Sequence, residues 1–515
     1  MQLTTTNDAK QASEDNILVA ARGGGIAFTG NLFVYLLRFA FGIVITRLLG
    51  AELFGYYSLG MVLADVAGTM ALLGFGSGIA RFIAIAITQK DNAQIGGVIQ
   101  IGLIIPGIAG LVLGAGTYLG ADLIAYQIYN KPELAPILRL ISIAIPLFAL
   151  MVGLEAVTQG FKRMEYKVYS EDISLNVLKL ILTVGLIGAG LGVRGAIGAY
   201  IIALAATVGM LFAFVNRLFP FRQLRLMAKR NVREMFHFTL PVYISQLVNE
   251  FSGSISTLIL GFFGAVSGVG VFTAALRISA IGTLFHTSLM RIASPMIADL
   301  HNQGKIDQLH RVYQTMTRWG MTFNLPIFLT TVFFSQPLLS IFGDDFISGS
   351  SGLIVLAFAA LFNASTGVCG TIVTMTGHSR VSLMNSLISL VTGIGLSLLT
   401  IPKWGLVGAA AASALCVILM NLLRLSEIYY FFRIWPYNIR FLKPITAALV
   451  AATAILLASP WLERLAYLWQ FLAGAALLWT IYIGTIVLLK FDPVDRLVLG
   501  RFWARFSPRA NEHSR

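Results

Sequence analysis

Long apolar stretches separated by short polar ones run along most of the chain. A helix needs about 20 mainly apolar residues to cross a bilayer. Fourteen stretches come close to that length, so the pattern predicts an all-α polytopic membrane protein with about 14 transmembrane helices. Their approximate cores are 25–48, 55–77, 96–119, 136–159, 173–191, 195–215, 237–261, 267–292, 318–341, 352–376, 380–401, 405–430, 443–459 and 467–489.

The composition agrees with this pattern. Of the 515 residues, 57% are hydrophobic and 12% charged, whereas a soluble chain carries about 25% charge. The net charge of +14 does not indicate a nucleic-acid partner, because the basic residues lie in short loops between apolar stretches. Cys369 and Cys416 lie in apolar runs without metal-ligand spacing, so we expect small core residues and no metal.

The densest basic segment lies near the middle of the chain, at residues 216–236. It is flanked by apolar stretches, and a Lys/Arg-rich loop in this setting indicates the cytoplasmic side. Its cations are Arg217, Arg222, Arg225, Lys229, Arg230 and Arg233.

The other loops extend this assignment. If the N-terminus is inside, most of the 37 Lys and Arg residues fall on the inner side. The predicted outer loops then carry only Arg47, Lys131, Arg194, Lys403 and Arg464. No signal peptide is visible at the N-terminus, so the first apolar stretch is expected to be retained. We predict a multi-pass protein of the cytoplasmic (inner) cell membrane with both termini cytoplasmic.

An internal repeat divides the chain around the basic segment. Three pairs of segments match at offsets of about 214, 217 and 210 residues, in the same order. Six spans, the basic loop and six more spans therefore form two parallel repeats, and substrate sites in such folds lie between the halves. The matching pairs are Gly50–Ser58 with Gly264–Thr273, Gln159–Arg163 with Thr376–Arg380, and Gly195–Ala199 with Gly405–Ala409.

The repeat sets the predicted domain organisation. Two six-helix bundles are flanked by polar ends, and two helices are appended after the second bundle. The predicted parts are a cytoplasmic N-terminal segment at 1–24, the first bundle at 25–215, the basic linker at 216–236, the second bundle at 237–432, the appended helices at 433–490 and a basic cytoplasmic tail at 491–515.

Three motifs carry a resemblance to a known family: Arg47–Leu59, Gln159–Met164 and Met375–Arg380. The chain resembles polysaccharide-biosynthesis (O-antigen) flippases of the multidrug/oligosaccharidyl-lipid/polysaccharide exporter superfamily over its first twelve spans. The resemblance implies transport of a polyprenyl-diphosphate-linked oligosaccharide to the outer leaflet by alternating access, for cell-surface polysaccharide synthesis. It implies no enzymatic activity and no cofactor. The lipid-linked glycan and membrane lipids are the expected partners, and other polysaccharide assembly proteins are candidates.

Arg38 is the most informative charge within a predicted span. Asn31, Tyr35 and Arg38 share one face of the first span. A charge at a helix centre costs roughly 2.5–3.5 kcal/mol, so it usually faces water or a partner. Arginine offers a rigid fork of donors that matches phosphate oxygens, which favours a diphosphate-binding role. The alternative is a structural pair with Asp65 in the next span.

The second half carries similar charges with opposite signs. Glu250, beside Asn249, corresponds roughly to Arg38, and Arg277 corresponds roughly to Asp65. Two alternatives are open for the pairs Arg38/Asp65 and Glu250/Arg277. Their side chains line a cavity between the halves, or the two opposite charges of each pair only neutralise each other.

Other charges lie nearer the span ends. Glu155 and Lys179 are predicted to pair. Arg139 and Arg291 are candidate substrate contacts, with snorkelling to head groups as the alternative. His286 is expected to be a hydrogen-bonded core residue. The candidate substrate-binding residues are thus Arg38, Arg277, Asn31, Tyr35, Arg291 and Arg139, and those for ion coupling or pairing are Asp65, Glu250, Asn249, Glu155 and Lys179.

Competing functions make different demands on the sequence. An ion-coupled small-molecule or drug antiporter of the same superfamily predicts a mainly acidic or aromatic cavity, whereas cations are at least as numerous within these spans. A membrane enzyme acting on lipid-linked sugars usually has a large outer loop, which is missing here.

Gly190–Gly195 fits a dinucleotide-binding pattern but lies between two spans without a preceding strand. There is no Walker motif, so we expect no ATP hydrolysis by this chain alone.

Overall fold

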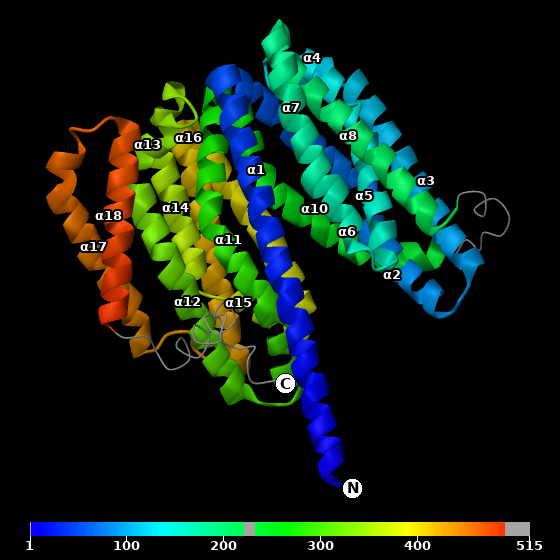
Figure 1. Cartoon of the computed structure of the whole chain (residues 1–515). Helices are drawn as coiled ribbons and strands as arrows, with labels where there is room; N and C mark the ends of the chain where they lie inside the picture. Colours follow the sequence, from blue (N-terminus) through cyan, green and yellow to red (C-terminus); the bar gives the residue numbers. More distant parts are fainter. Residues whose placement is uncertain (1, 221–231, 490–515) are drawn as a thin grey trace, which may run out of the picture. The chain divides into compact units, whose positions relative to one another are not determined.

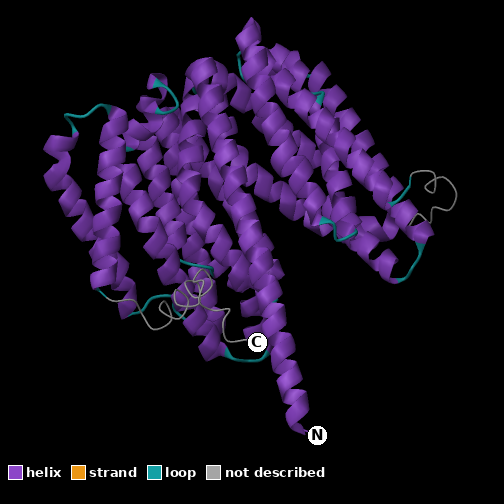
Figure 2. Cartoon of the chain, viewed as in Figure 1, coloured by secondary structure: helices purple, strands orange, loops and turns teal. Residues whose placement is uncertain are grey.

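The computed structural model describes the backbone of residues 2–220 and 232–489 and the side chains of residues 34–220, 234–291 and 293–489. Every element within these residues is helical and none is a strand (Figure 2). The predicted all-α fold is therefore confirmed. The centre of the basic linker and the predicted tail at 491–515 lie outside the described residues.

The chain forms two compact units, Met1–Ala274 (unit 1) and Ala275–Arg515 (unit 2). The division falls within α11 (Val266–Asn302), so unit 1 contains α10 (Val232–Phe263) in addition to the helices of the first repeat. The domain boundaries drawn from the repeat stay a prediction.

Unit 1 is built around α5 (Ala144–Gly160), which packs against α1, α2, α3 and α8. Eleven of the 17 residues of α5 are buried, which fits a central position. The other helices of this unit, labelled in part in Figure 1, are α1 (Gln2–Leu72), α2 (Phe75–Thr88), α3 (Asn92–Leu119), η1 (Leu123–Ile128), α4 (Leu134–Ile141), α6 (Met164–Lys167), η2 (Val168–Leu175), α7 (Asn176–Leu186), η3 (Ile187–Leu191) and α8 (Gly192–Leu218).

Nine helical segments of the described ranges are long and apolar enough to cross a membrane. Three of them, Val34–Thr88, Met164–Leu218 and Ser379–Phe432, have 54 or 55 residues, more than twice the roughly 20 that a bilayer requires. Each of the three is interrupted by a glycine with non-helical backbone angles, at Gly50, Gly190 and Gly405 respectively. A polytopic protein is confirmed, and the count of 14 spans stays a prediction.

The second predicted span, 55–77, is wrong at its end. The helix ends at Leu72, and Leu73 and Gly74 adopt left-handed angles with φ of 48° and 75°. Gly74 also lies against α10, where a Cβ would be 2.6 Å from the Thr239 carbonyl oxygen. Only glycine combines this backbone conformation with such a close approach, and hydropathy alone does not reveal the turn.

The first motif pair of the internal repeat forms a reciprocal contact within unit 1. A Cβ at Gly55 would collide with the carbonyl oxygen of Val266, and a Cβ at Gly270 would collide with that of Ala51. Ala51 and Gly55 precede Val266 and Gly270 by the same 215 residues. The helices α1 and α11 therefore cross through corresponding glycines, each packed on the backbone of the other.

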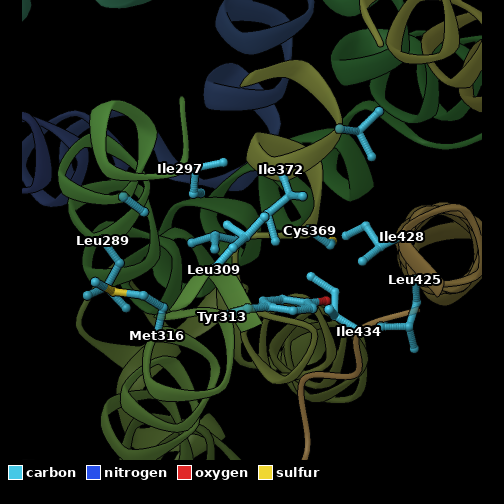
Figure 3. Packing of buried hydrophobic residues seen from close by; sticks show 13 residues of the cluster. Leu289, Ile297, Leu309, Tyr313, Met316, Cys369, Ile372, Leu425, Ile428 and Ile434 are labelled. Carbon is cyan, nitrogen blue, oxygen red and sulfur yellow. The ribbon is translucent and has the colours of Figure 1, made fainter. Parts of the chain in front are cut away.

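Unit 2 has an apolar core between α11, α12, α15 and α16, and its residues converge from these helices in Figure 3. Tyr313 is fully buried there and its hydroxyl donates to the Thr366 carbonyl oxygen at 3.0 Å. The helices of unit 2 after α11 are α12 (Ile306–Phe333), α13 (Ser335–Ser340), η4 (Asp344–Gly349), α14 (Ser350–Ser365), α15 (Cys369–Met375), α16 (Ser379–Phe432), η5 (Ile439–Phe441), α17 (Leu442–Leu462) and α18 (Tyr467–Leu488).

The appended helices α17 and α18 pair with each other and pack on α12 and α13. Trp479 Nε1 donates to Thr330 Oγ1 at 3.2 Å, and the Tyr482 hydroxyl donates to the Thr322 carbonyl oxygen at 2.8 Å. Both bonds satisfy polar groups that would be costly in lipid. The rest of α18 is largely exposed, as suits a helix surrounded by lipid.

Candidate functional site

Arg38 lies on α1 with 48% of its side chain exposed. Its Nη2 is 3.6 Å from Asp172 Oδ1 and 3.9 Å from Glu171 Oε1. A charge-assisted hydrogen bond is about 2.7–2.9 Å long, so these carboxylates neutralise the guanidinium without engaging its donors closely. Arg38 thus keeps donors for another anion.

The carboxylates reach Arg38 from η2, a π-helical segment between α6 and α7. The side chain of Asn176, only 2% exposed, donates to the carbonyl oxygens of Glu171 and Asp172 at 3.1 and 3.0 Å. These bonds compensate carbonyls that the wider turn would otherwise leave poorly paired. Segments of π-helix frequently occur at functional sites.

Lys167 connects η2 to α5. Its Nζ lies 3.1 Å from Glu171 Oε2 and 3.5 Å from Glu155 Oε2. Glu155 is only 3% exposed, and its other oxygen, Oε1, is buried without a hydrogen-bond partner. A continuous group of five ionisable side chains results, which we call the charge cluster: Arg38, Glu155, Lys167, Glu171 and Asp172.

A second polar group lies beside the charge cluster. Lys179 Nζ is 3.5 Å from Asn176 Oδ1 and 4.4 Å from the ring centroid of Phe41, which is within cation–π distance. The charges of Lys179 and Glu250 both act on the Asp65 carboxyl. Helices α1, α7 and α10 therefore bring these three ionisable groups near one another.

One predicted pair, Glu155 with Lys179, and one alternative pairing, Arg38 with Asp65, are wrong. The carboxylates within ion-pair distance of Arg38 are those of Glu171 and Asp172 rather than Asp65. Glu155 pairs with Lys167 rather than Lys179. In both cases the partner comes from the segment before the predicted fifth span, because the helix begins at Met164 instead of residue 173.

Sequence reasoning did not select three members of the charge cluster: Lys167, Glu171 and Asp172. They lie in a polar stretch that resembles an ordinary inner loop. The available signal was their spacing, since Lys167 and Glu171 are four residues apart, as in an ion pair on one helix face.

The remaining unit 1 candidates lie outside the charge cluster. Tyr35, one turn before Arg38, is 43% exposed, whereas the side chain of Asn31 is outside the described set. Asn249 is exposed, and Glu250 accepts from Ser254 Oγ at 3.5 Å. Arg139 forms an exposed ion pair with Asp122, at 2.6 Å.

Unit 2 holds the remaining candidates. Arg277 is partly buried, Arg291 is exposed, and His286 is 6% exposed. Because the two units are described separately, the predicted place of Arg277 near Arg38 and its pairing with Glu250 stay predictions.

Unit 2 also has a polar group that the sequence analysis passed over. Asn385 Nδ2 donates to Glu427 Oε2 at 2.8 Å, and the charge of Arg424, one turn earlier on α16, acts on both Glu427 and His286. Asn385 and Glu427 lie near the ends of the predicted eleventh and twelfth spans that the predicted topology assigns to the cytoplasmic side.

Known structures share this fold. A structure described as lipid II flippase MurJ in an inward closed conformation matches with a TM-score of 0.70, 15% identity and coverage of 90% of this chain and 98% of that one. An inward-facing multidrug resistance MATE family transporter matches with a TM-score of 0.64, 18% identity and coverage of 78% and 94%. The chain therefore shares the fold of these two multi-pass membrane proteins.

The sequence defines the family. Residues 20–301 match the polysaccharide biosynthesis protein family, and residues 241–399 match the MatE family. The chain belongs to the polysaccharide biosynthesis protein family.

Two curated relatives are similar over most of their length. The probable low-salt glycan biosynthesis flippase Agl15 of Haloferax volcanii is 24% identical over 77% of this chain and 80% of its own length. The capsular polysaccharide biosynthesis protein CapF of Staphylococcus aureus is 26% identical over 55% and 74%, respectively.

Proposed function

We propose that this protein is a flippase that moves a polyprenyl-diphosphate-linked oligosaccharide across the cytoplasmic membrane for cell-surface polysaccharide synthesis. The family membership, the relative named as a glycan biosynthesis flippase and the flippase fold support this proposal. The activity is transport without a chemical step.

Arg38 carries the substrate assignment. Its guanidinium is half exposed and loosely paired, although it lies within an apolar helix. An arginine within a membrane-spanning helix is costly in lipid and normally faces water or a polar partner. A diphosphate linking the lipid to the glycan has phosphate oxygens that match the arginine fork. Arg38 thus replaces part of the hydration that the diphosphate loses on entering the membrane.

The proposed transport cycle is alternating access. The two repeats rock against each other, and the cavity between them opens first to the cytoplasm and then outward. The glycan and diphosphate pass through the cavity, while the polyprenyl tail remains in the bilayer because it needs no polar compensation. Both termini are cytoplasmic in this arrangement, as the distribution of basic loops requires.

An ion-coupled small-molecule antiporter is the second candidate, because residues 241–399 match the MatE family. The two functions differ at Arg38. An anionic lipid-linked substrate requires a cation there, whereas an antiporter for cationic compounds is impeded by it.

Purified protein reconstituted into vesicles tests the proposal. The probe is a fluorescent polyprenyl-diphosphate-N-acetylglucosamine, and its transfer between leaflets is followed by quenching from one side. We expect protein-dependent transfer that falls at least about tenfold in Arg38→Ala, in line with the loss of a charge-assisted contact. Arg38→Lys should retain part of the activity.

Arg464→Ala serves as the matched control, because Arg464 is an exposed cation outside the charge cluster that lies over the Trp461 ring. Transfer that is independent of the protein, or that is equal in Arg38→Ala and wild type, would contradict the proposal. Transport of a cationic dye in the same vesicles, without transfer of the lipid probe, would favour the antiporter.

A further inference from the structure

The connection between α16 and α17 is rich in aromatic and basic residues. It joins two segments that are apolar enough to cross a membrane, Ser379–Phe432 and Ile439–Leu462, so it lies at a membrane face. We call Arg433–Lys443 the α16–α17 turn. The sequence has no acidic residue between Glu427 and Glu463, so every charged residue of this turn is basic. These cations are Arg433, Arg440 and Lys443.

Hydrogen bonds to α12 fix the backbone of the α16–α17 turn. His310 Nε2 donates to the Trp435 carbonyl oxygen at 2.8 Å. Asn438 Nδ2 donates to Gln314 Oε1 at 3.1 Å, and Asn438 Oδ1 accepts from the Arg440 backbone N–H at 3.1 Å. The turn is therefore a fixed structure, and the side chains that it exposes keep a defined arrangement.

The turn also exposes aromatic rings and apolar side chains. The Trp435 ring contacts those of Tyr429 and Tyr437 edge to face, with centroids 6.1 and 5.6 Å apart. Trp435 is 43% exposed and Ile439 is 79% exposed. Tryptophan and tyrosine are enriched where hydrocarbon meets lipid headgroups, because each has an apolar ring with a polar group at its edge. The exposed rings therefore indicate that the turn lies at the depth of the headgroups.

The cations of the turn lie beside these rings in the chain. Arg433 is exposed, and its guanidinium lies over the Tyr429 ring at 5.3 Å. Arg440 is exposed and belongs to η5, which leads directly into α17. The N-terminus of a helix carries partial positive charge and attracts anions. The start of α17 and the cations thus favour a negatively charged partner together.

We propose that the α16–α17 turn binds the headgroup of an anionic phospholipid. The phosphate contacts the cations, and the acyl chains run along Ile439 and the exposed Leu442 into the bilayer. The same cations repel the positive choline or ethanolamine group of a zwitterionic lipid, so the site is selective for lipids with net negative charge. This inference goes beyond the proposed function and does not depend on Arg38.

The opposite end of α17 provides an internal comparison. The turn between α17 and α18 also exposes aromatic rings, at Trp461 and Trp469, and Arg464 lies over the Trp461 ring at 5.5 Å. Glu463 precedes Arg464, so the two charges of that turn balance. Aromatic rings indicate an interfacial position for both turns. Of the two, the α16–α17 turn has the excess of cations that selects an anionic lipid.

Purified full-length protein in a nonionic detergent tests the proposal. Its thermal unfolding is followed while dioleoylphosphatidylglycerol or dioleoylphosphatidylcholine is added, because a ligand that binds the folded state raises the unfolding temperature. We expect phosphatidylglycerol to act at a lower concentration than phosphatidylcholine. Arg433→Gln should raise the phosphatidylglycerol concentration that gives half of the effect about fivefold, and the double variant with Arg440→Gln about 25-fold.

Two control variants locate the effect. Arg464→Gln removes an exposed cation that also lies over an aromatic ring, and it should respond to phosphatidylglycerol like the wild type. Arg38→Ala should also keep the full response, because the lipid site is separate from the charge cluster. If the double variant does not fold, the comparison of Arg433→Gln with Arg464→Gln still decides.

Three results would overturn the inference. The first is an equal response of the wild type to the two lipids, and the second is an equal loss of response in Arg433→Gln and Arg464→Gln. The third is a response to phosphatidylglycerol that disappears in Arg38→Ala, which would assign the lipid to the charge cluster. Inorganic phosphate is added separately, and a rise in unfolding temperature as large as that with phosphatidylglycerol would show a site for free anions and also contradict the proposal.

Discussion

Lys131, in the loop between η1 and α4, joins that loop to the end of α10. Its Nζ donates to the Gly261 carbonyl oxygen at 2.7 Å. Gly261 lies in the last turn of α10, whose carbonyls lack intrahelical partners and carry partial negative charge. One ammonium group thus satisfies a helix end and links two segments 130 residues apart.

Lys131→Met should therefore lower the stability of the protein. The variant retains the apolar stem but loses the bond to the helix end, and we expect a cost of about 1–2 kcal/mol. Thermal unfolding in detergent measures the change. Lys90→Met, at an exposed lysine, is the control and should unfold close to the wild-type temperature. Equal unfolding temperatures for both variants would show that the bond contributes nothing.

Lys131 also makes the stability of the folded chain depend on pH. Burial lowers the pKa of the Lys131 ammonium, so the folded chain releases this proton more readily than the unfolded chain. The unfolded state then binds more protons, and stability rises with pH in the range below the ordinary lysine pKa of about 10.4. The difference in unfolding temperature between wild type and Lys131→Met should widen as the pH increases through that range. A difference that narrows would contradict the assigned cause.

Among the elements, the crossing of α1 and α11 is the most sensitive to substitution. Gly55→Ala places a methyl group against the backbone of Val266, which cannot move aside as a flexible side chain can. Overpacking of this kind costs about 1–3 kcal/mol, so the unfolding temperature should fall.

Gly268→Ala is the matched control, because a Cβ at Gly268 meets nothing within 4 Å. It lies on α11 only two residues from Gly270, and its helix propensity should improve slightly. Equal stability of Gly55→Ala and Gly268→Ala would contradict this prediction, because it would show that the backbones of α1 and α11 move apart at the crossing without cost.

The sequence predicted the helix ranges well where exposure to lipid alone determines the residue pattern. Lipid exposure imposes long apolar stretches, so the helices α3, α8 and α18 lie close to their predicted ranges. The repeat was visible because the crossing glycines tolerate no side chain. By contrast, η2 results from a local widening of the helix that no hydrophobic period marks. The partners of Arg38 and Glu155 were missed for that reason, although both residues were identified as important.

For the whole molecule, the topology is the prediction to test. Single cysteines at Ser267 and Gln89 should react with a membrane-impermeant thiol reagent from the outside and the inside, respectively. Ser267 follows the α10–α11 turn, and Gln89 is exposed between α2 and α3. The native Cys369 is buried and Cys416 partly buried, so their background labelling should be low. Labelling of both sites from one side would refute the assigned orientation.

The reciprocal contact of Gly55 with Val266 and Gly270 with Ala51 also has a consequence for the origin of the chain. Residue i touching j while j touches i is the pattern of an isologous interface between two identical subunits. A six-helix ancestor that paired with a second copy about a two-fold axis would form the same contact twice. If the chain arose from such an ancestor by gene duplication and fusion, this contact would be preserved and would be older than the single chain that now contains both glycines.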